Sequence, residues 1–278
     1  MTQEDDKKMS SINGKQMASP SFRLPALDQD FLLGDSMRGV RFLLEYAKAE
    51  EALRAWAIRS TIVVFGSARV REDGPGPQPH WYAEARNFGR IASERGGALE
   101  VRDGLRDNVI ATGGGDGIMG AANRGAAEAG APSIGFNITL PHEQEPNAYS
   151  TPDLTFRFHY FAMRKMHLAM RANALLVFPG GFGTFDELFE LLTLCQTGKS
   201  RALPIVLFDR AFWSKVVNME ALAEYGLIGP SDTSLVTYAD SAEEAWSRMV
   251  EIGLDAYSHG APGQDNGDET AGPAPVSI

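Results

Sequence analysis

The chain has 278 residues, of which 44% are hydrophobic and 22% are charged, a composition typical of a globular protein with one large or two small domains. Its 36 acidic and 26 basic side chains give a formal net charge of −10, which disfavours nucleic-acid and membrane partners, so any phosphate site must be local. The single cysteine excludes a disulfide framework and a thiolate-rich metal site. With no apolar run long enough for a signal peptide or a membrane span, we expect a cytoplasmic protein.

Both ends of the chain are expected to be disordered tails. Residues 1–30 are polar and have no hydrophobic period, and residues 258–278 are rich in glycine, proline and acid. Between them we predict one domain over residues 31–257. It opens with a helical extension at about residues 35–58, where apolar side chains recur about every 3.6 residues.

From residue 61 to about residue 256, short apolar runs alternate with helical segments. We expect strands at 61–65, 108–111, 133–137, 154–158, 174–178, 204–208 and 235–238. Helices are expected at 79–95, 117–129, 160–171, 184–197, 211–225 and 241–256. Apolar strands that alternate with helices indicate a parallel sheet covered on both faces. The predicted fold class is therefore α/β, a single doubly wound Rossmann-like parallel sheet with an N-terminal helical extension.

Three of the predicted strands end in loops of small residues. These loops are Phe65-Gly66-Ser67-Ala68-Arg69, Thr112-Gly113-Gly114-Gly115-Asp116-Gly117-Ile118-Met119-Gly120 and Pro179-Gly180-Gly181-Phe182-Gly183-Thr184. Glycine lets the backbone approach an anion, and the N-terminus of a following helix adds partial positive charge. Ligands of open parallel sheets bind at the carboxyl ends of the strands, so three such loops indicate a phosphate or nucleotide pocket.

The second loop also matches the glycine pattern of dinucleotide-binding enzymes, so an NAD-dependent enzyme is one alternative. Two features disfavour this alternative. The loop follows the second predicted strand instead of the first, and the run Ser133 to Asn137 has no acidic residue at its end to hold a ribose hydroxyl.

Charged residues flank the third loop. Asp186, Glu187 and Glu190 follow it on the next predicted helix, and acid near a helix start is ordinary for Asp186 and Glu190. A carboxylate at Glu187 would repel an anion bound by the neighbouring loop, which is unfavourable unless the carboxylate has a function. It could activate a water or stabilise a cationic transition state.

The helix before the third loop carries basic residues. Arg164, His167 and Arg171 share one face of the helix predicted at 160–171, and a solvated face explains that spacing as readily as a site does. Because this helix leads into the strand that precedes the third loop, we expect Arg164 and Lys165 to meet a phosphate or ribose. The methionines of this helix and Phe161 are expected in the core.

Met163-Arg164-Lys165, followed about fourteen residues later by Pro179-Gly180-Gly181-Phe182-Gly183-Thr184-Phe185-Asp186-Glu187, resembles the signature of the Lonely Guy (LOG) family of nucleoside 5'-monophosphate phosphoribohydrolases. Members of this family are often labelled lysine decarboxylases. The two upstream glycine loops resemble the family as well, and the likeness covers roughly residues 61–256. The N-terminal helix makes the chain similar to the longer bacterial type.

This resemblance implies an enzyme that hydrolyses the N-glycosidic bond of AMP or an N6-modified AMP (a cytokinin nucleotide) and releases the free base and ribose 5-phosphate. It also implies a homodimer or a higher homo-oligomer. Arg164 and Glu187 match the catalytic residues of the family. The positions expected to contact the nucleotide are Ser67, Gly114, Gly115, Glu143, Lys165, Gly180, Gly181, Gly183, Thr184, Asp186 and Thr193.

The sequence departs from the family pattern at a few positions. Phe161 and Ala162 stand where the family has Met and His, and Asp186 stands where it has the first of two glutamates, so the base preference is left open. We expect no lysine decarboxylase activity, because no motif indicates a pyridoxal-binding lysine.

Glycosidic cleavage passes through an oxocarbenium-like state, which a carboxylate stabilises while loop amides hold the 5'-phosphate, so no metal or other cofactor is expected. The alternative is a non-catalytic nucleotide or molybdenum-cofactor binding or carrier protein of the same fold. Such a protein needs the glycine loops but has no need of Glu187 or the Arg164-Lys165 pair.

Overall fold

A computed structural model describes residues 12–141 and 145–254 of the chain. The tail predicted at residues 258–278 and the candidate site residue Glu143 lie outside the described residues. The chain divides into two compact units after Lys48.

The first unit consists of short helical segments. They are α2 (Gly14–Met17), η1 (Pro20–Phe22), η2 (Pro25–Leu27), α3 (Gln29–Leu33), η3 (Asp35–Met37) and the first part of α4 (Arg38–Ala55). Most of their side chains are exposed. These segments include the described part of the tail predicted through residue 30, and the disorder of that tail stays a prediction.

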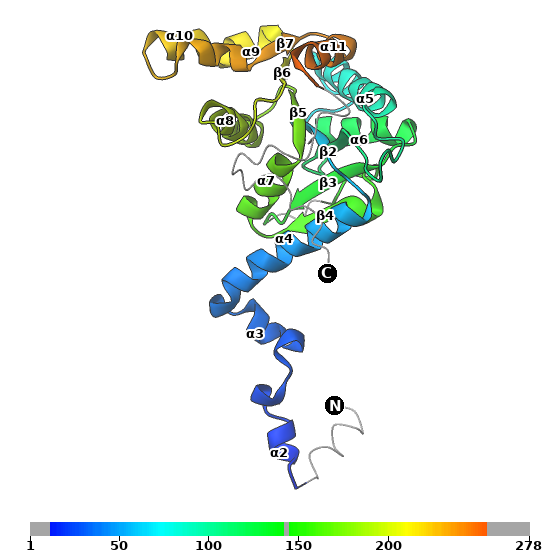
Figure 1. The fold of residues 1–278 in the computed structure, drawn as a ribbon, viewed down its shortest axis with the longest axis vertical. Helices are drawn as coiled ribbons and strands as arrows, with labels where there is room; N and C mark the ends of the chain where they lie inside the picture. The colour runs from blue at the N-terminus through cyan, green and yellow to red at the C-terminus, as the bar shows by residue number, and fades with distance from the viewer. Residues whose placement is uncertain (1–11, 142–144, 255–278) are drawn as a thin grey trace. The chain divides into compact units, whose positions relative to one another are not determined.

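The second unit is built on a seven-stranded parallel sheet (Figure 1). Its strands are β1 (Thr61–Phe65), β2 (Val109–Thr112), β3 (Ser133–Ile138), β4 (Thr155–Phe158), β5 (Ala172–Val177), β6 (Ile205–Phe208) and β7 (Thr237–Ala239). The spatial order is β4-β3-β2-β1-β5-β6-β7. The direction in which strands are added therefore reverses between β1 and β5, the place where ligands bind in open α/β sheets.

Helices cover both faces of the sheet. They are α5 (Gln78–Arg95), α6 (Ile118–Glu128), α7 (Phe161–Met170), α8 (Phe182–Gln196), α9 (Arg210–Val216), α10 (Met219–Glu224) and α11 (Ala242–Ile252), with the short η4 (Pro152–Leu154) and η5 (Pro230–Leu235).

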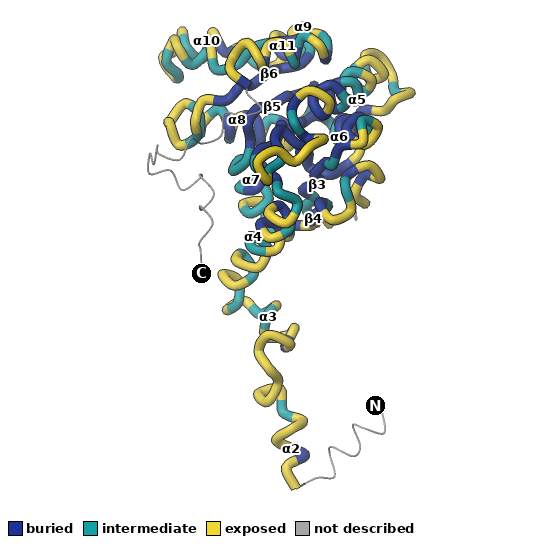
Figure 2. The backbone as a smooth tube through the Cα atoms, turned by 45° about the vertical axis from the view of Figure 1, so that its right-hand side comes forward, coloured by how far each residue is buried: buried dark blue, intermediate teal, exposed yellow. Residues whose placement is uncertain are grey.

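Two hydrophobic clusters form the core, one on each face. Ile62 and Val64 of β1 pack with α5, α6 and α11, whereas Val63 and Phe65 pack with the end of α4, α7 and α8. This division follows from the alternation of side chains along a strand. Strands β1, β2, β5 and β6, dark blue in Figure 2, are buried throughout between the helices. The predicted doubly wound Rossmann-like α/β fold is confirmed.

Two predicted helices differ in detail. The helix expected at 211–225 is divided into α9 and α10, because Val217 is extended and the side chain of Asn218 caps α10 by accepting the Ala221 N–H at 2.9 Å. The second difference concerns the predicted helical extension, part of which belongs to the sheet unit. Ala49 and Leu53, near the end of α4, belong to the core of the sheet unit.

In the part of the chain that the structure describes, no helix is long and apolar enough to span a membrane.

Candidate active site

The three glycine loops meet at the carboxyl edge of the sheet, as the sequence predicted. The Ser67 N–H donates to the Pro179 carbonyl at 3.1 Å, which ties the loop after β1 to the loop after β5. The Ile118 N–H donates to the Ser67 carbonyl at 3.2 Å and ties in the loop after β2. Loops that lie far apart in sequence therefore share one rim because β1, β2 and β5 are adjacent strands.

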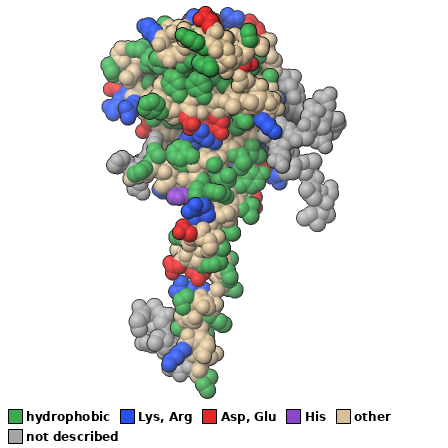
Figure 3. All heavy atoms as spheres, turned by 90° about the vertical axis from the view of Figure 1, so that its left-hand side faces the viewer, with side chains coloured by type: hydrophobic (Ala, Val, Ile, Leu, Met, Phe, Trp, Pro, Cys, Tyr) green, Lys and Arg blue, Asp and Glu red, His purple; other side chains and the backbone are tan. Residues whose placement is uncertain are grey.

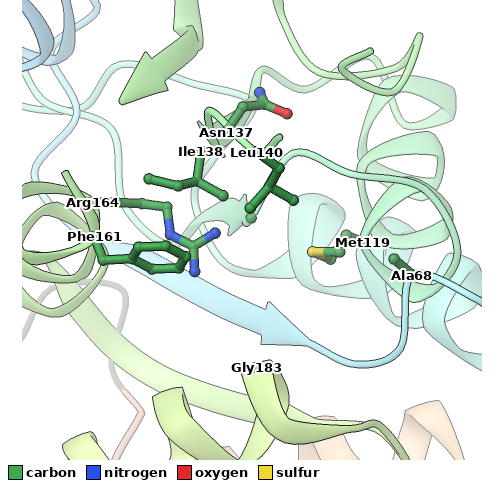
Figure 4. A pocket seen from close by; sticks show the side chains of 9 residues that line it. Ala68, Met119, Asn137, Ile138, Leu140, Phe161, Arg164 and Gly183 are labelled. Atoms are coloured by element: carbon green, nitrogen blue, oxygen red, sulfur yellow. The ribbon is translucent and has the colours of Figure 1, made fainter. Parts of the chain in front are cut away.

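A cavity of about 250 Å³ lies at this edge, and Figure 4 shows the side chains around it. Its lining residues are Ala68, Gly113, Met119, Asn137, Ile138, Leu140, Phe161, Arg164 and Gly183. Arg164 and Phe161 face it from α7, while Met119 and Ala68 lie across from them (Figure 4). A mostly apolar wall with one guanidinium suits a ligand that has an aromatic or apolar part and a polar or anionic part.

The third glycine loop leaves the start of α8 open. Gly181 is the N-cap residue and supplies no side-chain cap, and no atom lies within 4 Å of where side chains on Gly181 or Gly183 would begin. By contrast, a side chain on Gly180 would collide with the buried Thr184, which packs against it. The start of α8 thus has no side-chain cap, and the positive end of the helix dipole at this place favours an anion.

Arg164 and Glu187 form a buried ion pair between α7 and α8. Nη2 of Arg164 lies 2.8 Å from Oε1 of Glu187, and the side chains are 12% and 4% exposed. Burial raises the pKa of Glu187 above its ordinary value, and this effect outweighs the opposite effect of Arg164 and Lys165. Of the two, Arg164 lines the cavity and Glu187 lies behind it, joined by the ion pair. A carboxyl group whose pKa is raised is suited to exchanging a proton with a ligand or water that reaches it.

One further contact holds the Arg164 guanidinium in place, and one of its nitrogen atoms is left without a partner in the described part of the chain. The guanidinium lies 5.3 Å from the centre of the Phe161 ring, within the range of a cation–π interaction. Its Nε is buried and has no hydrogen-bond partner among the described residues. A charged donor left over at a cavity wall is available to a ligand or a water.

Lys165 is engaged by carboxylates instead of facing the cavity. Its Nζ lies 2.7 Å from Asp186 and 3.1 Å from Glu190. Burial lowers the pKa of Lys165, but hydrogen bonds to these two carboxylates outweigh burial and raise it. Lys165 therefore links α7 to α8, and neither Lys165 nor Asp186 is among the cavity-lining residues. The nucleotide contacts predicted for both stay predictions.

The remaining predicted contact residues lie at different depths around the edge. Ser67 is half-buried, and its Oγ accepts the Arg69 N–H at 3.1 Å. Gly114 and Gly115 are buried in the loop after β2, where Gly113 is the glycine that lines the cavity. Thr193 is exposed on α8 and donates to the Phe189 carbonyl at 2.7 Å, away from the lining residues.

Two predictions for the helix before β5 are wrong. Arg164, His167 and Arg171 do not form a solvated face: His167 is 1% exposed beside Phe136 and Phe158, and Arg171 bonds to Glu50 of α4 at 2.9 Å. Phe161, expected in the core, is 50% exposed and lines the cavity. It is the first residue of α7.

Sequence reasoning missed most of the cavity wall. Met119, Ile138 and Leu140 are ordinary apolar residues in the sequence, and only the order of the strands brings them together. It also missed Asn147, which bonds to the loop after β2 from a segment far along the chain. No local pattern marks such a residue.

Among residues 12–141 and 145–254, no group of three or more His, Cys, Asp or Glu side chains is placed to hold a metal ion.

Known proteins resemble this chain over the part that carries these residues. A family model described as "Possible lysine decarboxylase" matches residues 119–249, a range that holds Arg164, Lys165 and the third glycine loop. Cytokinin riboside 5'-monophosphate phosphoribohydrolase LOG3 of Arabidopsis thaliana is 25% identical over 169 residues, which cover 59% of this chain and 77% of that protein. Probable cytokinin riboside 5'-monophosphate phosphoribohydrolase LOG4 of Oryza sativa subsp. japonica is 25% identical over 197 residues, or 70% of this chain and 77% of that protein.

Among solved structures, the molybdenum cofactor binding protein of Rippkaea orientalis matches 70% of this chain and 96% of its own, with 19% identity and a TM-score of 0.47. The family model and the named relatives match the part of the chain that carries the Arg-Lys pair and the third glycine loop. Over this part the chain is similar to the LOG proteins.

Proposed function

We propose that this protein hydrolyses the N-glycosidic bond of a nucleoside 5'-monophosphate, either AMP or an N6-modified AMP of cytokinin biosynthesis. The products are the free base and ribose 5-phosphate. The observation that carries the proposal is the buried Arg164–Glu187 pair beside the cavity, since a protein that only binds its ligand has no need of a carboxylate there. The names of the plant relatives support the same reaction class.

The proposed reaction uses three parts of the site. The open amides of Gly181 and Gly183, at the start of α8, hold the 5'-phosphate. Glu187, when ionised, stabilises the positive charge that develops at C1' as the glycosidic bond breaks, and it accepts a proton from the attacking water. The bonding electrons leave with the base, which takes up a proton, and the water oxygen forms the new bond to C1'.

Arg164 has two tasks in this proposal. It lowers the pKa of the buried Glu187 carboxyl, which favours the ionised form, and it fixes the carboxyl in one orientation, because their atoms are 2.8 Å apart. Its unpartnered Nε is left to donate to a substrate oxygen or to a water at the cavity wall. The apolar cavity side chains Met119, Ile138 and Leu140 would then surround the base.

The proposal includes a cytoplasmic, cofactor-independent homo-oligomer, as predicted from the sequence. Figure 3 shows apolar side chains gathered on one face, and large exposed ones in the sheet unit include Phe182, Tyr225 and Leu227. Apolar surface of this kind is commonly covered by association. Light scattering of the purified chain measures its mass in solution. The mass of a monomer would contradict the proposed homo-oligomer.

The test is base release from a panel of nucleotides. Purified protein is incubated with AMP, N6-isopentenyl-AMP, other nucleoside monophosphates and adenosine, and free base is measured by chromatography. We expect release from at least one monophosphate and much less from adenosine, which lacks the phosphate anchor. Glu187→Gln should abolish most release, while the exposed acid variant Glu224→Gln serves as the matched control.

Two results would count against the proposal. If no monophosphate yields free base, it fails. Tight binding of a nucleotide without release would instead support the carrier alternative.

A further inference from the structure

A buried asparagine holds the loop after β2 from behind. Asn147 is 6% exposed, and its Nδ2 donates to the Gly114 and Gly115 carbonyls, each at 3.1 Å. Its backbone N–H also donates to the Gly114 carbonyl, at 2.9 Å. Two successive carbonyls of a glycine loop are thus bound by one residue from the segment between β3 and β4.

This residue belongs to a closed polar network. Nδ2 of Asn147 also lies 3.0 Å from Oδ1 of Asn123, which in turn accepts the Thr112 hydroxyl at 2.7 Å. Thr112 Oγ1 accepts the Gly114 N–H at 3.0 Å, and Asn123 Nδ2 donates to Ser133 Oγ at 2.9 Å. Thr112, Asn123 and Ser133 are all at most 1% exposed. Buried polar groups that satisfy one another in this way fix a single conformation.

The network dictates where the remaining amides of the loop point. In a trans peptide the carbonyl and the following N–H point in opposite directions. Because the Gly114 and Gly115 carbonyls face Asn147, the N–H groups of Gly115 and Asp116 face away from it. Neither of these two amides has an acceptor among the described residues, whereas the Gly114 amide is bound to Thr112.

We propose that Asn147 is a positioning residue for substrate binding, which aims the Gly115 and Asp116 amides at an anionic or hydroxyl oxygen of the ligand. It also sets the loop that places Gly113 and Met119 on the cavity wall. The inference rests on the proposed function for the identity of the ligand, a ribose 5-phosphate derivative. It assigns the donor role to the amides of Gly115 and Asp116, since the Gly114 amide is already engaged.

The variant Asn147→Asp isolates this role. It keeps the size of the side chain and the Oδ1 that accepts the Tyr149 and Ser150 N–H groups at 3.0 and 3.2 Å. It replaces the Nδ2 donor by an oxygen that faces three acceptor oxygens, so the loop must turn. We expect the KM for AMP to rise about tenfold or more while kcat falls far less, because the loss affects ligand contacts and leaves Glu187 in place.

Asn218→Asp is the matched control, because Asp caps a helix as well as Asn does and Asn218 is the N-cap residue of α10, which is not among the cavity-lining residues. It should leave KM unchanged. A folded Asn147→Asp variant, judged by circular dichroism and thermal unfolding, with an unchanged KM would overturn the inference.

A second measurement needs neither the variant nor turnover. Backbone amide NMR signals of the intact wild-type chain are followed during titration with ribose 5-phosphate. We expect the Gly115 and Asp116 signals to move strongly and the Gly114 signal to move less. If the Gly181 and Gly183 signals move but those of Gly115 and Asp116 do not, the inference is wrong and the proposed function stands.

The opposite result would separate the role of Asn147 from the proposed hydrolase activity. Strong shifts at Gly115 and Asp116 in a protein that releases no base would support the role of Asn147 and reject the hydrolase.

Discussion

Removing the positive member of the buried pair should cost stability in a pH-dependent way. In Arg164→Met, a side chain of similar length keeps most of the packing, but the Glu187 carboxyl, 3% exposed, loses its ion-pair partner. Breaking a buried pair by removing one partner costs about 3–5 kcal/mol if the other charge stays buried. A carboxyl group can avoid that cost by taking up a proton, which moves the cost to high pH.

The sign follows from the pKa of Glu187. Burial already raises that pKa above the ordinary value of 4.5, and Arg164 is the largest influence that lowers it, so the variant should raise it further. The native state then holds a proton that the unfolded state has released, and stability falls as pH rises above 4.5 toward the folded pKa. We expect a loss of about 3 kcal/mol at pH 8 and a smaller loss of about 1 kcal/mol at pH 5, because a raised pKa lets the buried carboxyl take up a proton more readily at the lower pH.

Urea unfolding at the two pH values measures both losses, against a typical stability of about 5–15 kcal/mol. The double variant Arg164→Met with Glu187→Gln has no buried charge at this place, so it should recover most of the loss at pH 8. Equal losses at pH 5 and pH 8, or a double variant no more stable than Arg164→Met, would refute the reasoning that Arg164 offsets the buried charge of Glu187.

Three further predictions concern the same edge of the sheet. Glu187→Gln should reduce turnover about 10²–10⁴-fold. Because the pKa of Glu187 is raised, wild type should also lose stability relative to this variant as pH rises above 4.5; a variant that loses stability instead would contradict the pKa assignment. Lys165 lowers the pKa of Glu187, so Lys165→Met should move the acid limb of kcat/KM to higher pH, and a limb that stays in place would show that Lys165 has no such effect. Gly180→Ala should cost about 1–3 kcal/mol because its methyl group meets Thr184, whereas Gly181→Ala, with open space, should cost less than about 0.5 kcal/mol; chemical denaturation compares the two, and equal costs would contradict the packing.

The two members of the Arg164-Lys165 pair illustrate how far a motif reaches. Their spacing to the third glycine loop predicts that both lie near it, and both do. The motif does not predict that Arg164 pairs with Glu187 at the cavity while Lys165 turns to Asp186 and Glu190. Neighbours in sequence point about 100° apart on a helix, and what each one meets depends on how α8 packs against α7.

His167 and Phe161 show that the burial of a single residue is also poorly predicted by the sequence. The spacing of His167 from Arg164 and Arg171 is compatible with a solvated face, yet His167 is buried beside Phe136 and Phe158 of β3 and β4. Phe161, an aromatic residue expected in the core, is exposed at the cavity. The spacing of hydrophobic residues predicts which face of a helix is buried. Which residues on the helix are in fact buried depends on how the helix packs on the sheet.

The sequence by itself determined the alternation of apolar strands and helices, the parallel α/β sheet, and the three glycine loops at strand ends, because these features are encoded in local periods and turn residues. Only the tertiary structure decided which residues line the cavity, which carboxylate each cation of α7 meets, and that Asn147 holds the loop after β2. Each of these contacts joins segments distant along the chain, and the strand order β4-β3-β2-β1-β5 that brings them together leaves no trace in any single segment.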